Sequence, residues 1–144
     1  MDRIVVGIDG SQCSREALRF AADEARLRGA QLRIVCAWQV PTMLYPAAGF
    51  TAALDPASFE GYARDSAVEV VGAVLGADSG IEHELVVRQG NPAHVLLEES
   101  AEAAMLVLGS RGHGGFVGLL LGSVSQQCAA HSKAPVVIVH ERSS

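Results

Sequence analysis

The feature that most constrains the fold of this chain is an alternation of two hydrophobic periods. Short β-branched runs alternate with segments whose apolar residues recur at helical spacing, beginning with RIVVGID at 3–9 and a helix that ends at Gly29. Further strands are expected at 31–38, 81–88, 104–109 and 135–140, and further helices at 55–76, at 91–102 and after Ser123. Such alternation predicts parallel strands joined by crossover helices.

The apolar content of the strands indicates their order. The runs IVVGI and MLVLG are continuously apolar, which is typical of strands covered on both faces, whereas 81–88 alternates and is expected near an edge. We therefore expect an α/β fold with a doubly wound five-stranded parallel sheet in the order 3-2-1-4-5 and helices on both faces. Ligands of such sheets bind where the winding reverses, here beside Asp9-Gly10-Ser11 and Gly109–Gly112.

Composition limits the remaining classes. A chain of 144 residues with 49% hydrophobic content fits one domain, residues 1–144. The net charge of -5 and the lack of Lys/Arg runs argue against nucleic acid as a partner. No apolar run is long enough for a signal peptide or a membrane span, so no membrane association and a cytoplasmic location are expected. Cys13, Cys36 and Cys128 are expected to be buried thiols rather than disulfides or metal ligands, and the histidines show no metal-ligand spacing.

A glycine-rich segment follows the fourth expected strand. It lacks the lysine of a Walker loop and the third glycine of a dinucleotide fingerprint. Glycines 109, 112 and 122 are expected to allow close backbone approach or positive φ. The N–H groups of 123–125 at a helix start would form an anion site suited to phosphate. Alternatively, Ser123 and Gln126 form a capping box, which would explain Ser123 without any ligand.

These residues carry a family resemblance. Gly109-Ser-Arg-Gly112, nine residues and then Gly122-Ser123 resemble the G-2x-G-9x-G-S/T signature of ATP-binding members of the universal stress protein family. Around it, VVGIDGSQCSREAL, AWQVP and APVVIVH are similar to the family's first strand and turn, second strand end and closing strand. The resemblance implies an adenine nucleotide alpha hydrolase-like fold, ATP and Mg²⁺ as ligands, and a role as a stress-response regulator or signalling module.

The resemblance also implies which residues contact the nucleotide. Asp9 and Gly10 would border the adenosine, and the backbone around Ala37 would face the adenine. The residues implied around the ribose and phosphates are Leu108, Gly109, Arg111, Gly112, Gly122, Ser123, Val124 and Ser125.

Elementary electrostatics refines these roles. An ionised Asp9 would repel phosphates, so we assign it to a nucleoside edge or hydroxyl and only secondarily to a metal, leaving Mg²⁺ to phosphate oxygens and water. Arg111 either neutralises phosphate or is a solvated loop residue, and the same alternative holds for His113. Gly7 is expected to let the nucleotide or the loop approach the sheet. The long connection at 39–55 is either a lid or packing on the second helix.

The sequence also bears on functions other than nucleotide binding. A response-regulator receiver needs acidic and lysine residues that are absent after the third and fifth strands, and a flavin carrier would need more aromatic residues. Without a P-loop lysine, at most weak ATPase activity is expected, so binding is favoured over turnover. A stress-related interaction module that uses no nucleotide, or a binder of another adenine nucleotide such as cAMP, stays open.

Assembly is predicted from the last strand. PVVIVH is strongly apolar, yet the expected order leaves it at a sheet edge, where natural proteins rarely expose such a strand. We expect a homodimer through Val136 to Val139, paired antiparallel about a two-fold axis. The family resemblance implies the same interface.

Overall fold

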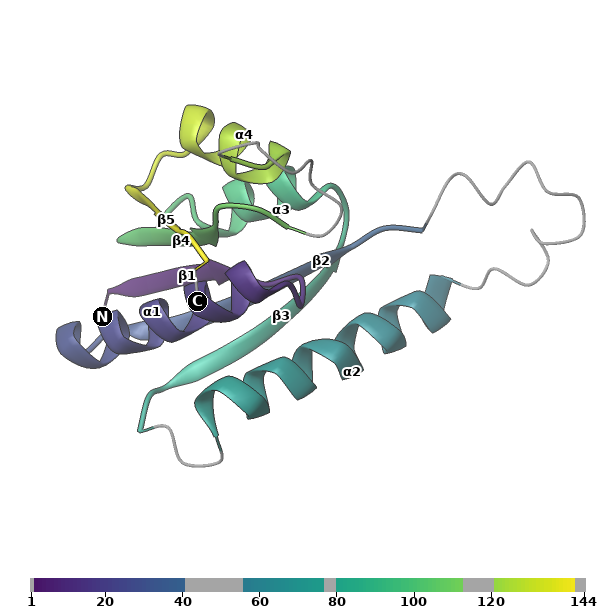
Figure 1. Ribbon diagram of the computed structural model, residues 1–144, viewed down its shortest axis with the longest axis horizontal. Helices are drawn as coiled ribbons and strands as arrows, with labels where there is room; N and C mark the ends of the chain where they lie inside the picture. The colour runs from purple at the N-terminus through teal and green to yellow at the C-terminus, as the bar shows by residue number, and fades with distance from the viewer. Residues whose placement is uncertain (1, 41–55, 77–79, 113–120, 142–144) are drawn as a thin grey trace, which may run out of the picture.

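The computed structural model describes residues 2–40, 56–76, 80–112 and 121–141 (Figure 1). Its strands and helices alternate along the chain as the hydrophobic periods predict. They are β1 (Arg3–Gly7), α1 (Gln12–Arg28), β2 (Gln31–Trp38), α2 (Pro56–Leu75), β3 (His83–Gln89), α3 (Pro92–Glu99), β4 (Met105–Gly109), α4 (Ser123–His131) and β5 (Val136–Val139).

The strands form one five-stranded sheet in the order β3-β2-β1-β4-β5, and every pairing is parallel. At its centre, Ile4 of β1 is level with Leu32 of β2 and with Met105 of β4. The predicted order is therefore confirmed, including the edge position of β3. The first two crossover connections add β2 and β3 on one side of β1, and the next two add β4 and β5 on the other. The direction of winding therefore reverses between β1 and β4.

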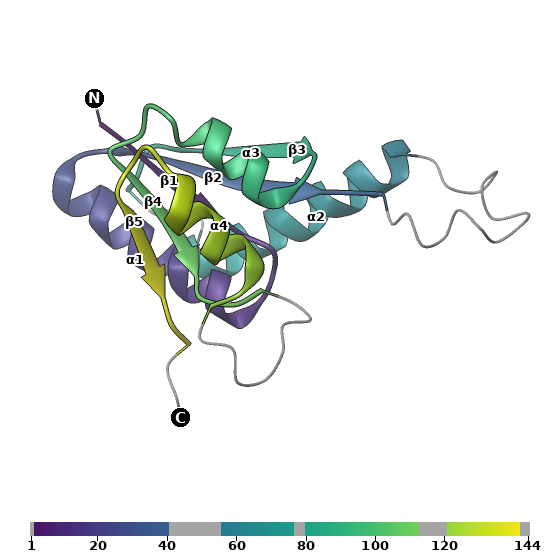
Figure 2. The same ribbon diagram turned by 90° about the horizontal axis from the view of Figure 1, so that it is seen from above.

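Two helices cover each face of the sheet, as predicted (Figure 1). The successive strand residues Ile4, Val5 and Val6 are fully buried, but they alternate between the two cores because side chains alternate across a strand. Ile4 and Val6 pack with α1 and α2, whereas Val5 packs with α3 and α4. On that second face α3 and α4 lie side by side (Figure 2).

Local signals explain most helix boundaries. The Ser11 side chain caps α1 and Gly29 ends it in the left-handed region at φ 62°, a conformation that favours glycine. Asn91 caps α3, with Pro92 as its first residue. The prediction that this helix continues through Glu102 is wrong. It ends at Glu99 because the chain turns at Ser100, whose carbonyl accepts from the N–H of residue 103, before it enters β4.

None of the helices in the described ranges is both long and apolar enough to cross a bilayer.

Candidate functional site

A cavity of about 520 Å³ opens at the carboxyl ends of β1 and β4, where the winding of the sheet reverses. This is the location that the topology predicts for a ligand, and the volume lies in the range of small-molecule sites. All the residues assigned to the site from the sequence line it except Gly10. Gly10 instead forms the turn between β1 and α1, with φ 85°. The cavity lining that was predicted comprises Asp9, Ala37, Leu108, Gly109, Arg111, Gly112, Gly122, Ser123, Val124 and Ser125.

Helices α1 and α4 both begin at this cavity, and their first turns differ. At α1 the Ser11 Oγ accepts from the N–H of Ser14 at 3.2 Å. The N–H of Ser11 itself donates to Asp9 Oδ1 at 2.9 Å, so Asp9 is held by the turn that leads into the helix. The side chains of Ser11 and Asp9 thus already accept hydrogen bonds from amides at the start of α1.

The start of α4 has no such cap. Its N-cap residue is Gly122, with extended backbone at φ -74° and ψ 172°, and among the described residues no cap side chain accepts from the first-turn amides. The capping-box alternative is therefore wrong, since Ser123 is the first residue of the helix and not its cap. The Gln126 side chain donates to the carbonyl of Leu121 at 2.8 Å. Within the described part of the chain, the first amides of α4 and the positive end of its dipole thus face the cavity without a side-chain acceptor.

Ser125 has a structural task at the same helix start. Its hydroxyl donates to the carbonyl of Ser110 at 2.9 Å and lies 3.1 Å from the carbonyl of Gly122. The residue is 2% exposed. Ser125 therefore ties α4 to the end of β4, and its proton is not available to a ligand. Ser123, by contrast, is exposed at the cavity.

The three glycines of the spacing motif have different surroundings. A Cβ on Gly109 would lie 2.7 Å from the backbone carbon of Cys13, so this glycine lets α1 pack against β4. A Cβ on Gly112 would lie 2.5 Å from Asp9 Oδ2, whereas one on Gly122 would meet nothing closer than 3.5 Å. None of the three has positive φ. Close approach is confirmed at Gly109 and Gly112, where the neighbouring groups are the Cys13 backbone and the Asp9 carboxylate.

Another part of the cavity lining is apolar. It is formed by Val35 and Ala37 of β2 and by Pro92 and Leu96 of α3. Gly7 lies beneath it, and a Cβ there would come within 2.9 Å of both Leu96 methyl groups. Among the described residues it is α3 that approaches the sheet at Gly7, which also lines the cavity, and approach of a nucleotide there stays a prediction.

Sequence reasoning missed several lining residues. Val35 could have been found, since it precedes Ala37 by two residues and so shares its face of β2. Pro92 and Leu96 carry no signal beyond an amphipathic helix. The missed residues are Ile8, Ser14, Val35, Pro92, Leu96 and Gln126, whereas Gly7 and Ser11, which the sequence already places near the ligand, also line the cavity.

Among the described residues, the charged side chains of the lining are Asp9 and Arg111, which follow the carboxyl ends of the neighbouring strands β1 and β4. Arg111 is half-buried, and within the described part of the chain no carboxylate forms an ion pair with it. No three His, Cys, Asp or Glu side chains in the described ranges are grouped to hold a metal ion. Arg111 is therefore the cation that this cavity offers to an anionic ligand.

The cysteines are buried and free, as predicted. Burial raises the pKa of the Cys36 thiol, and the negative charge of Asp9 raises it further. Burial alone raises the pKa of Cys128 to about 11. Both thiols therefore stay protonated near neutral pH and are poor nucleophiles. His113 and residues 41–55, for which a phosphate-binding role and a lid were considered, lie outside the described residues.

Comparison with known proteins places this architecture in a family. Residues 1–140 match the profile of the Universal stress protein family. Universal stress protein Rv2005c of Mycobacterium tuberculosis is 34% identical over 139 residues, which are 96% of this chain and 45% of that protein. The chain thus spans about half the length of the curated relatives it matches.

Solved structures show the same fold. A universal stress protein in complex with cAMP is 29% identical, with a TM-score of 0.63 and 98% coverage of both chains. The universal stress protein of Archaeoglobus fulgidus in complex with dAMP is 24% identical, with a TM-score of 0.57 and coverage of 96% of this chain and 98% of that one. Family profile, relatives and fold agree, and the chain belongs to the universal stress protein family.

Proposed function

We propose that this chain binds an adenine nucleotide, with ATP as the principal candidate, in the cavity between β1 and β4. The observation that carries the proposal is the division of the cavity into an apolar wall and a donor-rich wall. Ala37 and Pro92, backed by the buried Val35 and Leu96, offer an apolar surface for a base. The start of α4 and Arg111 offer donors for phosphate. Structural neighbours in complex with cAMP and dAMP support the choice of an adenine nucleotide.

The proposed orientation follows from the charges. Phosphates would lie at Gly122–Ser125, where amides and a helix dipole face the cavity. Asp9 would face the nucleoside, since its carboxylate already accepts from the N–H of Ser11 and would repel phosphate. Asp9 by itself cannot enclose Mg²⁺, which in our proposal binds mainly through phosphate oxygens and water.

In this proposal the protein is a cytoplasmic regulator that responds to stress through nucleotide occupancy rather than through turnover. Fast phosphoryl transfer needs several charge clamps and a positioned acceptor. The described cavity lining supplies one arginine. Hydrolysis would accordingly be slow or absent.

The test is to identify the ligand that native protein releases, by mass spectrometry, and then to titrate ATP, cAMP and adenosine by calorimetry. Mg-ATP that binds at micromolar to millimolar concentration supports the proposal. Preference for cAMP would keep the site and change its ligand. No heat and no thermal shift with any adenine nucleotide would leave the chain as an interaction module that uses no nucleotide.

A homodimer through β5 is part of the proposal. Val136 to Val139 are only half-buried, although β5 is an apolar strand at the sheet edge. Pairing with a second copy would cover them and satisfy the edge.

A further inference from the structure

Helix α3 carries two kinds of contact on one of its faces. Pro92, Leu96 and Glu99 are separated by four and then three residues, which brings them onto the same side of a helix. Pro92 and Leu96 form part of the apolar cavity wall. Glu99 lies at the other end of this face, and its side chain is only 16% exposed. Because these residues belong to one helix, bonds that hold Glu99 in place also hold Pro92 and Leu96 in place at the cavity.

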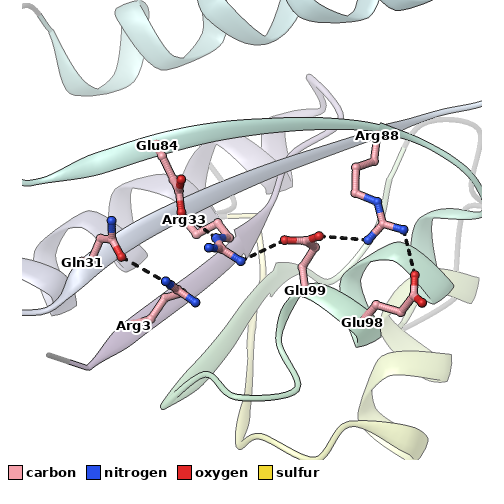
Figure 3. Close-up of polar contacts among 7 residues, drawn as sticks. All are labelled: Arg3, Gln31, Arg33, Glu84, Arg88, Glu98 and Glu99. Carbon is pink, nitrogen blue, oxygen red and sulfur yellow. Dashed lines mark hydrogen bonds and ion pairs between the residues drawn. The ribbon is translucent and has the colours of Figure 1, made fainter.

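Glu99 is fixed by two arginines from two different strands (Figure 3). Its Oε1 accepts from Arg33 Nη1 of β2 at 3.0 Å, and its Oε2 accepts from Arg88 Nη1 of β3 at 2.9 Å. Each carboxylate oxygen thus has its own cationic donor, and such charge-assisted bonds are stronger than neutral ones. The carboxylate joins α3 to β2 and β3 at once.

The arginines are in turn held by other carboxylates. Arg33 Nε donates to Glu84 Oε1 at 2.7 Å, and Arg88 Nη2 donates to Glu98 Oε1 at 2.8 Å. The bond to Glu98, and after it the bond to Glu99, raises the pKa of Arg88. Loss of the Glu99 charge would therefore leave each arginine with a partner, and no unpaired charge would remain to unfold the protein.

At the cavity end, α3 has little freedom to move toward the sheet. Both Leu96 methyl groups lie so close to Gly7 that a Cβ there would come within 2.9 Å of each. The contact with Gly7 limits inward movement, and the bonds of Glu99 oppose outward movement. On β2, Arg33 precedes the wall residue Val35 by two positions and so points to the same face.

We propose that Glu99 is a positioning residue for the nucleoside part of the site. Through Arg33 and Arg88 it holds α3 at the distance from β2 that the base requires. The inference rests on the proposed function, because it assigns the wall of Pro92 and Leu96 to the base. The quantity to measure is the affinity for adenosine, because an uncharged ligand responds little to the loss of a negative charge from the protein.

The experiment compares Glu99→Gln with Glu24→Gln in the full chain. Glu24 is a matched control because it also pairs with an arginine, Arg28 at 3.0 Å, and its side chain is 23% exposed, but it lies on α1 outside the cavity lining. Calorimetry with adenosine, well below the unfolding temperature, should show about fivefold weaker binding for Glu99→Gln. Binding to Glu24→Gln should equal that of the wild type.

Hydrogen exchange of the unliganded protein supplies a second readout. The amides of α3 should exchange faster in Glu99→Gln than in the wild type, while those of α1 stay unchanged. If Glu99→Gln fails to fold, Arg88→Gln replaces it, because Arg88 is 36% exposed at the sheet edge and its loss leaves Glu99 bonded to Arg33. That variant should lose about twofold in adenosine affinity.

The outcomes separate the two proposals. Wild-type protein that binds neither adenosine nor ATP overturns the proposed function and this inference with it. Wild-type protein that binds adenosine, with Glu99→Gln folded and equal in affinity, overturns only the inference and leaves Glu99 with a role in stability.

Discussion

The substitution Gly122→Asp tests the anion site at α4, because it should change stability and binding in opposite directions. Gly122 has the extended backbone of an N-cap residue, and a Cβ there would meet nothing closer than 3.5 Å. Aspartate therefore fits and would cap the free amides of α4. A better cap adds a few tenths of a kcal/mol and the charge at the positive helix end adds a similar amount, for a total of about 0.5–1 kcal/mol.

The same carboxylate would occupy the place proposed for phosphate. Two like charges about 4 Å apart repel by about 4 kcal/mol at the effective dielectric constant of a protein surface. Allowing for relaxation of the ligand, we expect ATP affinity to fall by at least about 100-fold. Adenosine affinity should not change, because the nucleoside lies toward the apolar wall.

The assay combines thermal unfolding without ligand and calorimetry with ATP and adenosine. The melting temperature of Gly122→Asp should rise by about 1–4 °C for a chain of this size. Gly122→Asn is the matched control, since it can cap the helix without charge and should weaken ATP binding only about tenfold. Our assignment would be refuted by a Gly122→Asp variant that is less stable than the wild type, or that binds ATP as tightly.

Three further predictions concern packing, pH and assembly. Gly109→Ala should destabilise the fold by about 2–3 kcal/mol in urea unfolding, because its Cβ would lie 2.7 Å from the Cys13 backbone, whereas Gly61→Ala on open α2 surface should not destabilise it. Burial raises the folded-state pKa of Cys128 from 9.0 to about 11, so the free energy of unfolding should be unaffected by this thiol below pH 9 and should fall by about 2–3 kcal/mol as the pH rises toward 11. In Cys128→Ala, the free energy of unfolding should depend less on pH between 9 and 11. Ile138→Pro should give a folded monomer by light scattering. The carbonyls of residues 135 and 139 accept from β4, so residue 138, on the other side of the strand, directs its N–H to the open edge, and proline removes only that donor. An unchanged dimer would exclude β5 as the interface.

The fold could be predicted from the sequence because alternation and burial leave few topologies. Continuous apolar runs at β1 and β4 indicated central strands, and charges in β3 indicated an edge. Once the order is known, the reversal between β1 and β4 locates the cavity without further knowledge of side chains. Asp9 and Arg111 lie two positions after the last residues of these strands, so sequence reasoning could place them at the cavity.

The apolar wall was not within reach, because it depends on how α3 lies across the sheet. Pro92 and Leu96 look like the cap and core residues of any amphipathic helix. They lie at the cavity because Leu96 packs closely against Gly7, which has no side chain, and because Glu99 bonds to arginines of two strands. Contacts of this kind join residues far apart in the sequence, and no local pattern reports them.

The glycine motif shows why a correct pattern can still hide different causes. Gly109 is required by the packing of α1, Gly112 by the carboxylate of Asp9, and Gly122 by neither, since a Cβ there would make only ordinary contacts at 3.5 Å or more. Loss of ligand binding in a Gly109 variant would thus report a damaged core, and in a Gly112 variant a displaced Asp9. A Gly122 variant that keeps its stability is the one whose binding defect would report on the proposed phosphate position alone.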